Sequence, residues 1–421
     1  MKEQIEGYKL RIDNRISIRV NWRPKVSQPI SSKEVSLLHQ KIDRKSTKLM
    51  RVISEDGIAI SITIASVKKT TPSILILAKT VVDVLRKVMS KANTSNIPRF
   101  LDDNKIKYIS VKYSSEDFSN NIHVEIVPFN DFLQDLEFAN KILSGHYDDL
   151  LDVVTLKKKI GEEYSDANQE ERKIEYLELL KNREKNIGIF GEDLYTDMIR
   201  AMRMAVQDEF IVNMRPKLFY LYNYHLTKGY FKEGREDYTT RIEFRNSKSF
   251  SKWLQKVPLY IILPSLPFDI QTSKEFMNSV RRTLTEFRER NEILTPVYSP
   301  FFLDVIYKPA KRSLYNCADV DYLMKLIIPE FNRVFKYEQA SKNQRKREIF
   351  KDFGRSKYTG SPVVGYNSIE VPRINDNEEG ILIISISRYN VKPESIRERI
   401  DKVINRAVKY NLIGESILTD T

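Results

Sequence analysis

Hydrophobic positions over residues 14–130 follow two periods, one typical of strands and one typical of helices. The segment 57–66 alternates apolar with polar positions and is rich in β-branched residues, which predicts a strand. From 74 to 89 the apolar side chains recur every three or four positions, which predicts an amphipathic helix. The full predicted order is strand, helix, strand, helix, strand and strand, over 16–22, 31–50, 57–66, 74–89, 106–113 and 122–129.

The same order of elements returns in the second half of the chain. A Ser-Lys-Glu sequence opens the first helix of both series, at 32–34 and again at 273–275. We interpret this as an internal repeat, because chance similarity rarely preserves element order. The alternative is two generic α+β halves whose helix starts coincide. The second series covers 259–263, a helix from 273, 301–307, 319–335, 366–374 and 381–389, with the larger insertion at 336–363.

The pattern predicts an α+β fold of two modules, each a small mixed sheet with two helices. The first module is 1–130 and the second is 256–392. The connector, 131–255, is mainly helical, and its scarcity of Pro and Gly indicates a structured segment. The stretch 393–421 forms a C-terminal helix. The clearest connector helices are predicted at 133–143, 170–186 and 193–215.

Charge changes this picture by indicating a polyanionic partner. The chain has a formal net charge of +13 and a sequence pI of about 9.3, which favours nucleic acid. Alternatively, the basic charge reflects only the amino-acid usage of an AT-rich genome, since Lys, Ile, Asn and Tyr are abundant. The basic and aromatic stretch 215–224, which contains Lys217, would stack on unpaired bases or bury its rings in a core.

Several other classes find no support in the sequence. The single cysteine, Cys317, excludes an internal disulfide and fits a reducing compartment. No zinc spacing, Walker loop or dinucleotide fingerprint occurs, and no apolar run is long enough for a membrane span. The first residues carry no apolar core of signal-peptide length. We therefore expect a cytoplasmic protein of a prokaryotic or phage type, without a membrane partner.

The strongest candidate chemistry lies where a predicted strand leads into the helix at 319–335. Asp319 and Asp321 are two positions apart and can both point at one ion. Magnesium prefers oxygen ligands, commonly one or two carboxylates with water and substrate phosphate. Lys325 follows one turn later and can neutralise charge on a phosphate. The alternative is structural, since aspartate at a helix start is also a good cap.

This Asp-x-Asp-x-x-x-Lys pattern after a hydrophobic strand resembles the signature of the RusA family of Holliday-junction endonucleases. The resemblance covers 256–391 and, in the first copy, 14–130. It implies a Mg²⁺-dependent protein that binds four-way junctions and nicks DNA, with Mn²⁺ as a substitute metal. Family members are small homodimers, so the tandem copies are expected to pair as a pseudo-dimer within the chain, with a homodimer of chains as a further option.

Each copy departs from the family pattern at a different place. The second copy keeps the paired aspartates and the lysine, but Asn367 stands at the family's acidic turn. The first copy keeps the acidic turn, Asp102 and Asp103, and the helix lysine Lys79, but Ser73 and Leu75 replace the paired aspartates. The resemblance therefore implies one composite site. Its catalytic residues are Asp319, Asp321, Lys325, Asp102 and Asp103, its metal ligands are Asp319, Asp321 and Asn367, and Asp304 is a substitute ligand.

The expected function is recognition and metal-assisted nicking of branched DNA. One alternative is a branched-DNA-binding or DNA-architecture protein without nuclease activity, because the divided ligand set would weaken metal binding. Another is an RNA-binding structural protein that uses 215–232 as a stacking surface. The expected contacts to the DNA backbone are Lys68, Lys69, Lys79, Lys217, Arg312, Arg345, Lys346 and Arg347.

Overall fold

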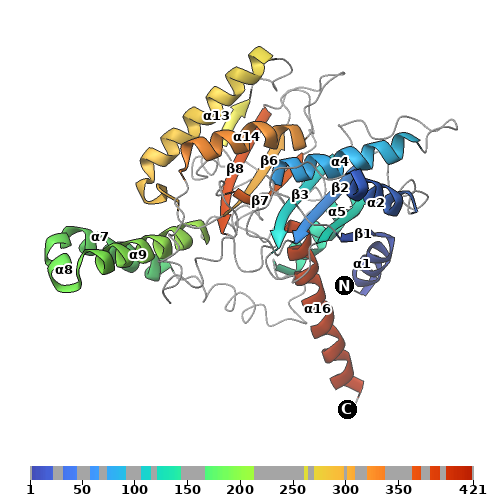
Figure 1. The fold of residues 1–421 in the computed structure, drawn as a ribbon. Coiled ribbons are helices and arrows are strands. Elements are labelled where there is room, and N and C mark those ends of the chain that lie inside the picture. The colour runs from blue at the N-terminus through green and yellow to red at the C-terminus, as the bar shows by residue number, and fades with distance from the viewer. Residues whose placement is uncertain are drawn as a thin grey trace.

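The protein is represented by a computed structural model, which describes fourteen segments of the chain. They are 2–21, 32–44, 57–65, 74–91, 106–114, 121–143, 166–212, 260–263, 270–297, 301–308, 320–336, 363–370, 380–388 and 395–419. Within them the fold is α+β, as the sequence predicts, with helices on both sides of one mixed sheet (Figure 1).

The first half of the chain follows the predicted order closely. An additional helix, α1 (Lys2–Asn14), comes before the first strand, and α5 (Phe129–Leu143) follows the last one. Between them the elements are β1 (Ile16–Asn21), α2 (Ser32–Asp43), β2 (Ile58–Ala65), α4 (Ile74–Lys91), β3 (Ile106–Ser114) and β4 (Asn121–Pro128).

The second half repeats this order after a helical segment. That segment contains α7 (Asp166–Lys181), α8 (Arg183–Phe190) and α9 (Glu192–Val212). The repeated elements are β5 (Tyr260–Leu263), α13 (Ile270–Arg290) with the short 3-10 helix η3 (Glu292–Leu294), β6 (Phe301–Lys308), α14 (Val320–Val334), β7 (Val363–Glu370), β8 (Gly380–Arg388) and α16 (Ile396–Thr419).

The strands of both halves join in one sheet whose order reads the same from either edge. The order is β1-β4-β2-β3-β7-β6-β8-β5, so each strand of the first half has its counterpart at the mirrored place. β2 and β3 are parallel, as are β6 and β7, and the register of each pair shifts after its first residue. The central strands β3 and β7 pair antiparallel, with Ser110 opposite Asn367. An approximate two-fold axis therefore passes between these two residues.

The strand register corrects one predicted match between the halves. From the sequence, Asn367 stands at the acidic turn that Asp102 and Asp103 occupy in the first copy. The register shifts of the two parallel pairs and the pairing of β3 with β7 instead make Ser110 the counterpart of Asn367. The prediction placed the start of β7 at 366, whereas the strand begins at Val363. All eight residues of β7 are buried, so neither face of the strand is exposed to solvent. Its sequence therefore lacks the alternation of polar and apolar residues that would have located its start.

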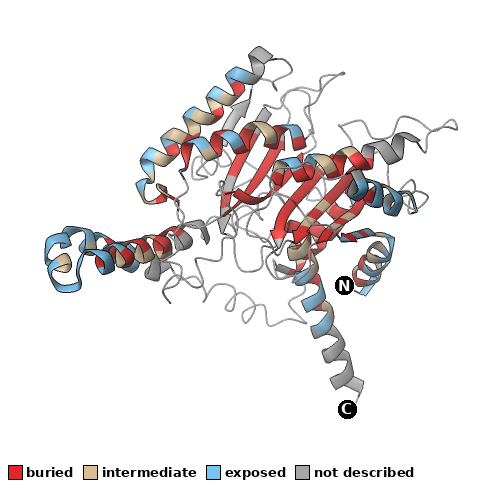
Figure 2. Ribbon diagram, viewed as in Figure 1, coloured by how far each residue is buried: buried red, intermediate tan, exposed pale blue. Residues whose placement is uncertain are grey.

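Two separate hydrophobic cores lie on the two faces of the sheet. The described strands between them are mostly buried (Figure 2). The first core gathers α2, α4, α13 and α14, and includes Ile60, Val111 and Leu303 from the strands. The second gathers α1, α5 and α16 on the opposite face, over Ala59, Tyr108 and other strand residues of opposite parity. Since strand side chains alternate between faces, most members of the two sets separate by register. The exception is the register shift of β6, where Phe301, Phe302 and Leu303 all belong to the first core.

The repeat unit includes one more helix than the sequence indicated. Residues 131–143 were assigned to the connector and 393–421 to a separate terminal helix, but α5 and α16 each follow the last strand of their half. The two helices pack against each other on one face of the sheet. The halves therefore meet twice, through β3 with β7 and through α5 with α16.

The helices α7, α8 and α9 form a hairpin that projects from the layers around the sheet (Figure 1). The predicted helix 170–186 is broken at Asn182, between α7 and α8. Gly191 ends α8 with a positive φ of 78°, a conformation that glycine adopts without a Cβ penalty. At the base of the hairpin, Arg203 and Gln207 of α9 donate hydrogen bonds to backbone carbonyls of 292–296.

Candidate functional site

The candidate catalytic residues that the structure describes lie in the first two turns of α14. Asp321 is completely buried, while the side chain of Lys325 is 32% exposed. Lys325 Nζ lies 2.6 Å from Asp321 Oδ2, one helical turn apart. Within the described segments, neither carboxylate oxygen of Asp321 accepts a hydrogen bond of good geometry. A buried carboxylate with spare lone pairs is suited to a cation, although its ion pair with Lys325 already neutralises part of the charge.

The matching helix of the other half keeps the lysine but not the acid. When the first residues of α4 and α14 are aligned, Asp321 corresponds to Leu75 and Lys325 to Lys79. Lys79 is exposed, and Leu75 packs against the first core. The two helices contact each other on the same face of the sheet. The described part of α4 therefore adds a cation near this face and no carboxylate at the matched position.

The remaining predicted acids of the composite site cannot be placed. Asp319 immediately precedes α14, and Asp102 and Asp103 precede β3, but all three lie outside the described residues. No group of three or more metal-ligating side chains occurs among the residues that are described. Asp321 thus fits one ligand position of a magnesium site, and the site would need Asp319 to supply a second carboxylate.

Asn367, the third predicted ligand, lies on the wrong face of the sheet for this site. Its Nδ2 donates to Asp304 Oδ1 at 2.6 Å, and its Oδ1 accepts from the Tyr108 hydroxyl at 3.1 Å. Tyr108 belongs to the second core and stacks on Phe132 of α5, whereas α14 covers the first core. The prediction that Asn367 shares an ion with Asp321 is therefore wrong, and the same applies to Asp304 as a substitute.

Buried polar residues at the centre of the sheet are held by one another. Asp304 and Asn367 are both nearly inaccessible, and Tyr108 is fully buried. Burial raises the pKa of the Tyr108 hydroxyl, so it remains a neutral donor across the working pH range. Asn367 satisfies both ends of its amide in this chain. The arrangement fixes the junction between β3, β7 and β6, and it is a structural network rather than a ligand site.

A row of polar side chains crosses seven strands at the level of the two-fold axis. Each member is the direct cross-strand neighbour of the next. Sequence reasoning missed this row because its members are far apart in the chain and only strand register aligns them. In order from β1 to β8 the row is Ser17, Glu125, Ser61, Ser110, Asn367, Asp304 and Ser385.

At the β1 edge this face carries a histidine in a partly buried position. The Ser17 hydroxyl lies 2.7 Å from His123 Nε2, and Glu125 Oε1 lies 3.6 Å from the same nitrogen. Burial is the main reason why the pKa of His123 is lowered from its ordinary value, with Glu125 acting in the opposite direction and Arg19 in the same one. Because both neighbours approach one ring nitrogen, this is not the relay geometry of a catalytic triad.

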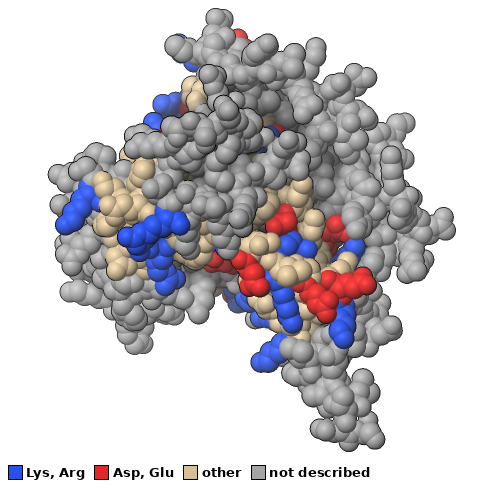
Figure 3. Space-filling model, turned by 90° about the vertical axis from the view of Figure 1, so that its right-hand side faces the viewer, with Lys and Arg blue, Asp and Glu red and all other residues tan. Residues whose placement is uncertain are grey.

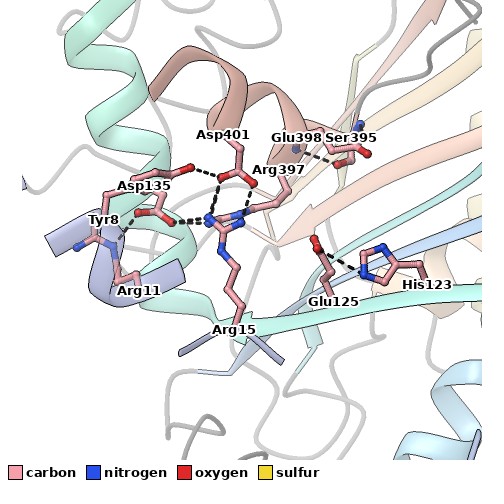
Figure 4. A network of polar contacts seen from close by, with 10 residues as sticks. All are labelled: Tyr8, Arg11, Arg15, His123, Glu125, Asp135, Ser395, Arg397, Glu398 and Asp401. Carbon is pink, nitrogen blue, oxygen red and sulfur yellow. Dashed lines mark hydrogen bonds and ion pairs between the residues drawn. The ribbon is translucent and has the colours of Figure 1, made fainter. Parts of the chain in front are cut away.

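A cluster of arginines and aspartates ties α1 to α5 and α16 (Figure 4). Asp135 of α5 is fully buried between Arg11, at 2.7 Å, and Arg397, at 2.6 Å. The two terminal nitrogens of the Arg15 guanidinium each donate a hydrogen bond of 2.7 Å to one carboxylate oxygen of Asp401 on α16. The cluster joins helices from both halves of the chain.

The start of α16 is fixed by a reciprocal cap. The backbone N–H of Ser395 donates to the Glu398 carboxylate, and the Glu398 N–H donates to the Ser395 hydroxyl. This is the capping box expected from a serine followed three residues later by glutamate. Lys112 of β3 also pairs with Glu398. The helix from the second half is thereby attached to the central strand of the first half.

The predicted DNA-backbone contacts fall mostly outside the described segments. Of that set the structure places only Lys79, which is exposed on α4. On the face shown in Figure 3, Lys and Arg side chains are mixed with Asp and Glu over the centre and right, and lie among uncharged residues on the left. That face is therefore not a single-sign patch within the part that is described. The positions that cannot be placed are Lys68, Lys69, Lys217, Arg312, Arg345, Lys346 and Arg347.

Comparisons with known proteins add no assignment. No family model matches the chain, and no curated protein or solved structure is significantly similar to it. None of the described helices is long and apolar enough to cross a membrane.

Proposed function

We propose that this chain binds branched DNA as an intramolecular pseudo-dimer of two RusA-like modules and nicks it at one metal-dependent centre on α14. The observation that carries the proposal is the buried carboxylate of Asp321 beside Lys325 at the start of α14. The sequence places a second carboxylate, Asp319, two positions before Asp321. An acid pair followed by a lysine at a helix start is a pattern that suits a divalent cation and a phosphate.

The paired halves support the choice of substrate. A four-way junction has approximate two-fold symmetry, and a protein with a matching axis can contact equivalent arms with equivalent surfaces. The palindromic strand order and the antiparallel pairing of β3 with β7 provide such an axis within one chain. The net charge of +13 favours a polyanion over other branched or symmetric partners.

Asp321 and Asp319 would hold the divalent ion. Mg²⁺, or Mn²⁺ in its place, supplies positive charge to the phosphate and lowers the pKa of water when it is bound. Lys325, whose side chain is one third exposed, reaches from the buried carboxylate toward solvent. There it contacts the scissile phosphate while it pairs with the Asp321 carboxylate. Since α4 has Leu75 at the position of Asp321, one chain has one such centre and nicks one strand at a time.

The direct test compares nicking of a synthetic four-way junction with nicking of a linear duplex of the same sequence. Wild-type protein is expected to nick the junction only with Mg²⁺ or Mn²⁺. Asp321→Asn should lower the rate at least about 100-fold, because a neutral amide is a poor ligand for a hard cation. Glu289→Gln is the matched control, since that carboxylate is exposed on α13. Unchanged nicking by Asp321→Asn would overturn the proposed centre.

A second candidate is a branched-DNA-binding protein without nuclease activity. It is favoured by the complete burial of Asp321 and by its ion pair with Lys325, which resemble a structural helix start. This alternative predicts equal junction affinity for wild type and Asp321→Asn, with no cleavage under any divalent ion. Binding and cleavage measured on the same junction therefore separate the two candidates.

A further inference from the structure

The hairpin of α7, α8 and α9 carries a large share of the exposed apolar side chains in the described residues. Three of them, Ile174, Leu177 and Leu180, recur every three residues along α7 and are 54%, 53% and 41% exposed. Such spacing places them along one side of the helix. Other exposed apolar side chains of the hairpin are Ile189 and Phe190 of α8 and Leu194 of α9.

These side chains differ from the ones that are buried inside the hairpin. Its own interior uses other residues, with Tyr176 of α7 and Tyr195 of α9 buried between the helices. The Tyr195 hydroxyl donates to the Leu179 carbonyl at 3.1 Å, and the Asn186 amide donates to the same carbonyl at 3.4 Å. The described part of the hairpin thus packs around these tyrosines and leaves the apolar stripe of α7 exposed, and exposed apolar patches commonly mark interaction sites.

The charge of the hairpin indicates what kind of partner fits. Its exposed ionisable groups over 171–194 nearly cancel, whereas the chain as a whole is strongly basic. A surface for DNA would be basic and would not need leucines. A balanced surface is also where two copies of a chain with net charge +13 can approach without strong repulsion. The exposed cations are Arg172, Lys173, Lys181, Arg183 and Lys185, and the exposed anions are Glu171, Glu175, Glu178, Glu184, Glu192 and Asp193.

We propose that the hairpin is a homodimerisation arm, and that the hairpins of two chains pack their apolar sides together as a four-helix bundle. Two antiparallel helices with one exposed stripe are half of such a bundle. A two-fold contact requires only that one surface be complementary to itself, and this is the commonest symmetry of soluble oligomers. The hairpin projects from the sheet layers, so its free end can meet a second copy (Figures 1 and 2).

The first test measures the mass of the full chain in solution by light scattering, without DNA. Wild-type protein at about 50 µM should have a measured mass twice that of one chain, since this concentration exceeds the Kd of an ordinary stable dimer. Leu177→Glu with Leu180→Glu should weaken the dimer at least about 100-fold, because each dimer loses four buried leucines. Leu10→Glu is the matched control, as Leu10 is exposed on α1, away from the hairpin.

A second measurement keeps the test independent of folding. In a Cys317→Ala background, Leu177→Cys should form a covalent dimer under mild oxidation, and Leu10→Cys should not. A monomeric wild type at the stated concentration would overturn the proposal. So would a dimer that survives the double glutamate variant, or equal crosslinking from both cysteine positions. None of these readouts involves nuclease activity, so the dimerisation proposal is tested independently of the proposed nuclease centre on α14.

Discussion

Replacing Asp135 by asparagine tests how firmly the two halves of the chain are joined. Asp135 lies on α5 with 1% of its side chain exposed, and it is contacted by Arg397 at 2.6 Å and Arg11 at 2.7 Å. Arg397 is 3% exposed and its second carboxylate, Asp401, is farther away at 3.3 Å. Asp135→Asn therefore leaves a buried guanidinium with one distant counter-ion.

The expected cost follows from that geometry. Removing one partner of a buried ion pair costs about 3–5 kcal/mol, and the lower end applies here because Asp401 partly compensates Arg397. Arg11 contributes less, since its side chain is 16% exposed and water can replace the carboxylate. We expect a loss of about 3 kcal/mol in the free energy of unfolding.

Urea denaturation followed by far-UV circular dichroism measures this loss. The control is the double variant Asp135→Asn with Arg397→Met, in which the buried cation is also removed. Its cost should be smaller than the sum of the two single costs, because the penalty comes from an uncompensated charge. A single-variant loss under about 1 kcal/mol, or strict additivity in the double variant, would refute the reasoning.

Three further predictions concern the sheet. Because burial lowers the pKa of His123 below its ordinary 6.5, the unfolded chain binds that proton more readily, so the free energy of unfolding should fall as pH drops through 6.5. His123→Gln should flatten this dependence in urea melts at a series of pH values, and an unchanged slope would contradict it. A Cβ at Gly365 would lie 2.1 Å from the Phe302 ring, so Gly365→Ala should lower the melting temperature, and Phe302→Leu should partly restore it if the clash is the cause. Tyr108→Phe leaves Asn367 without its buried donor and should cost about 1–2 kcal/mol, measured by urea titration, with no loss pointing to a different partner.

The secondary structure was largely predictable because it depends on local periodicity. Alternating β-branched residues in β2 and apolar residues at helical spacing in α4 identify those elements within one or two residues of their bounds. One exception is α1, which the sequence did not indicate. It buries only Ile5 and Tyr8 of its thirteen residues, so its apolar pattern is weak and its stability comes from docking onto α5.

The candidate site was predictable only in part. The relation between Asp321 and Lys325 is set by one helical turn, so spacing alone places the ammonium near the carboxylate. Whether that carboxylate is exposed is a tertiary property, and the structure buries it completely.

The sequence by itself determined the element types, their repeated order and the acid and lysine on one helix. Tertiary structure alone decided that the halves share one sheet through β3 and β7, and that Asn367 faces Tyr108 and Asp304 rather than α14. The physical reason is that strand side chains alternate faces every residue, so a residue's neighbours depend on a register set by distant strands. Helical neighbours are fixed within one turn, whereas sheet neighbours are chosen by the whole fold.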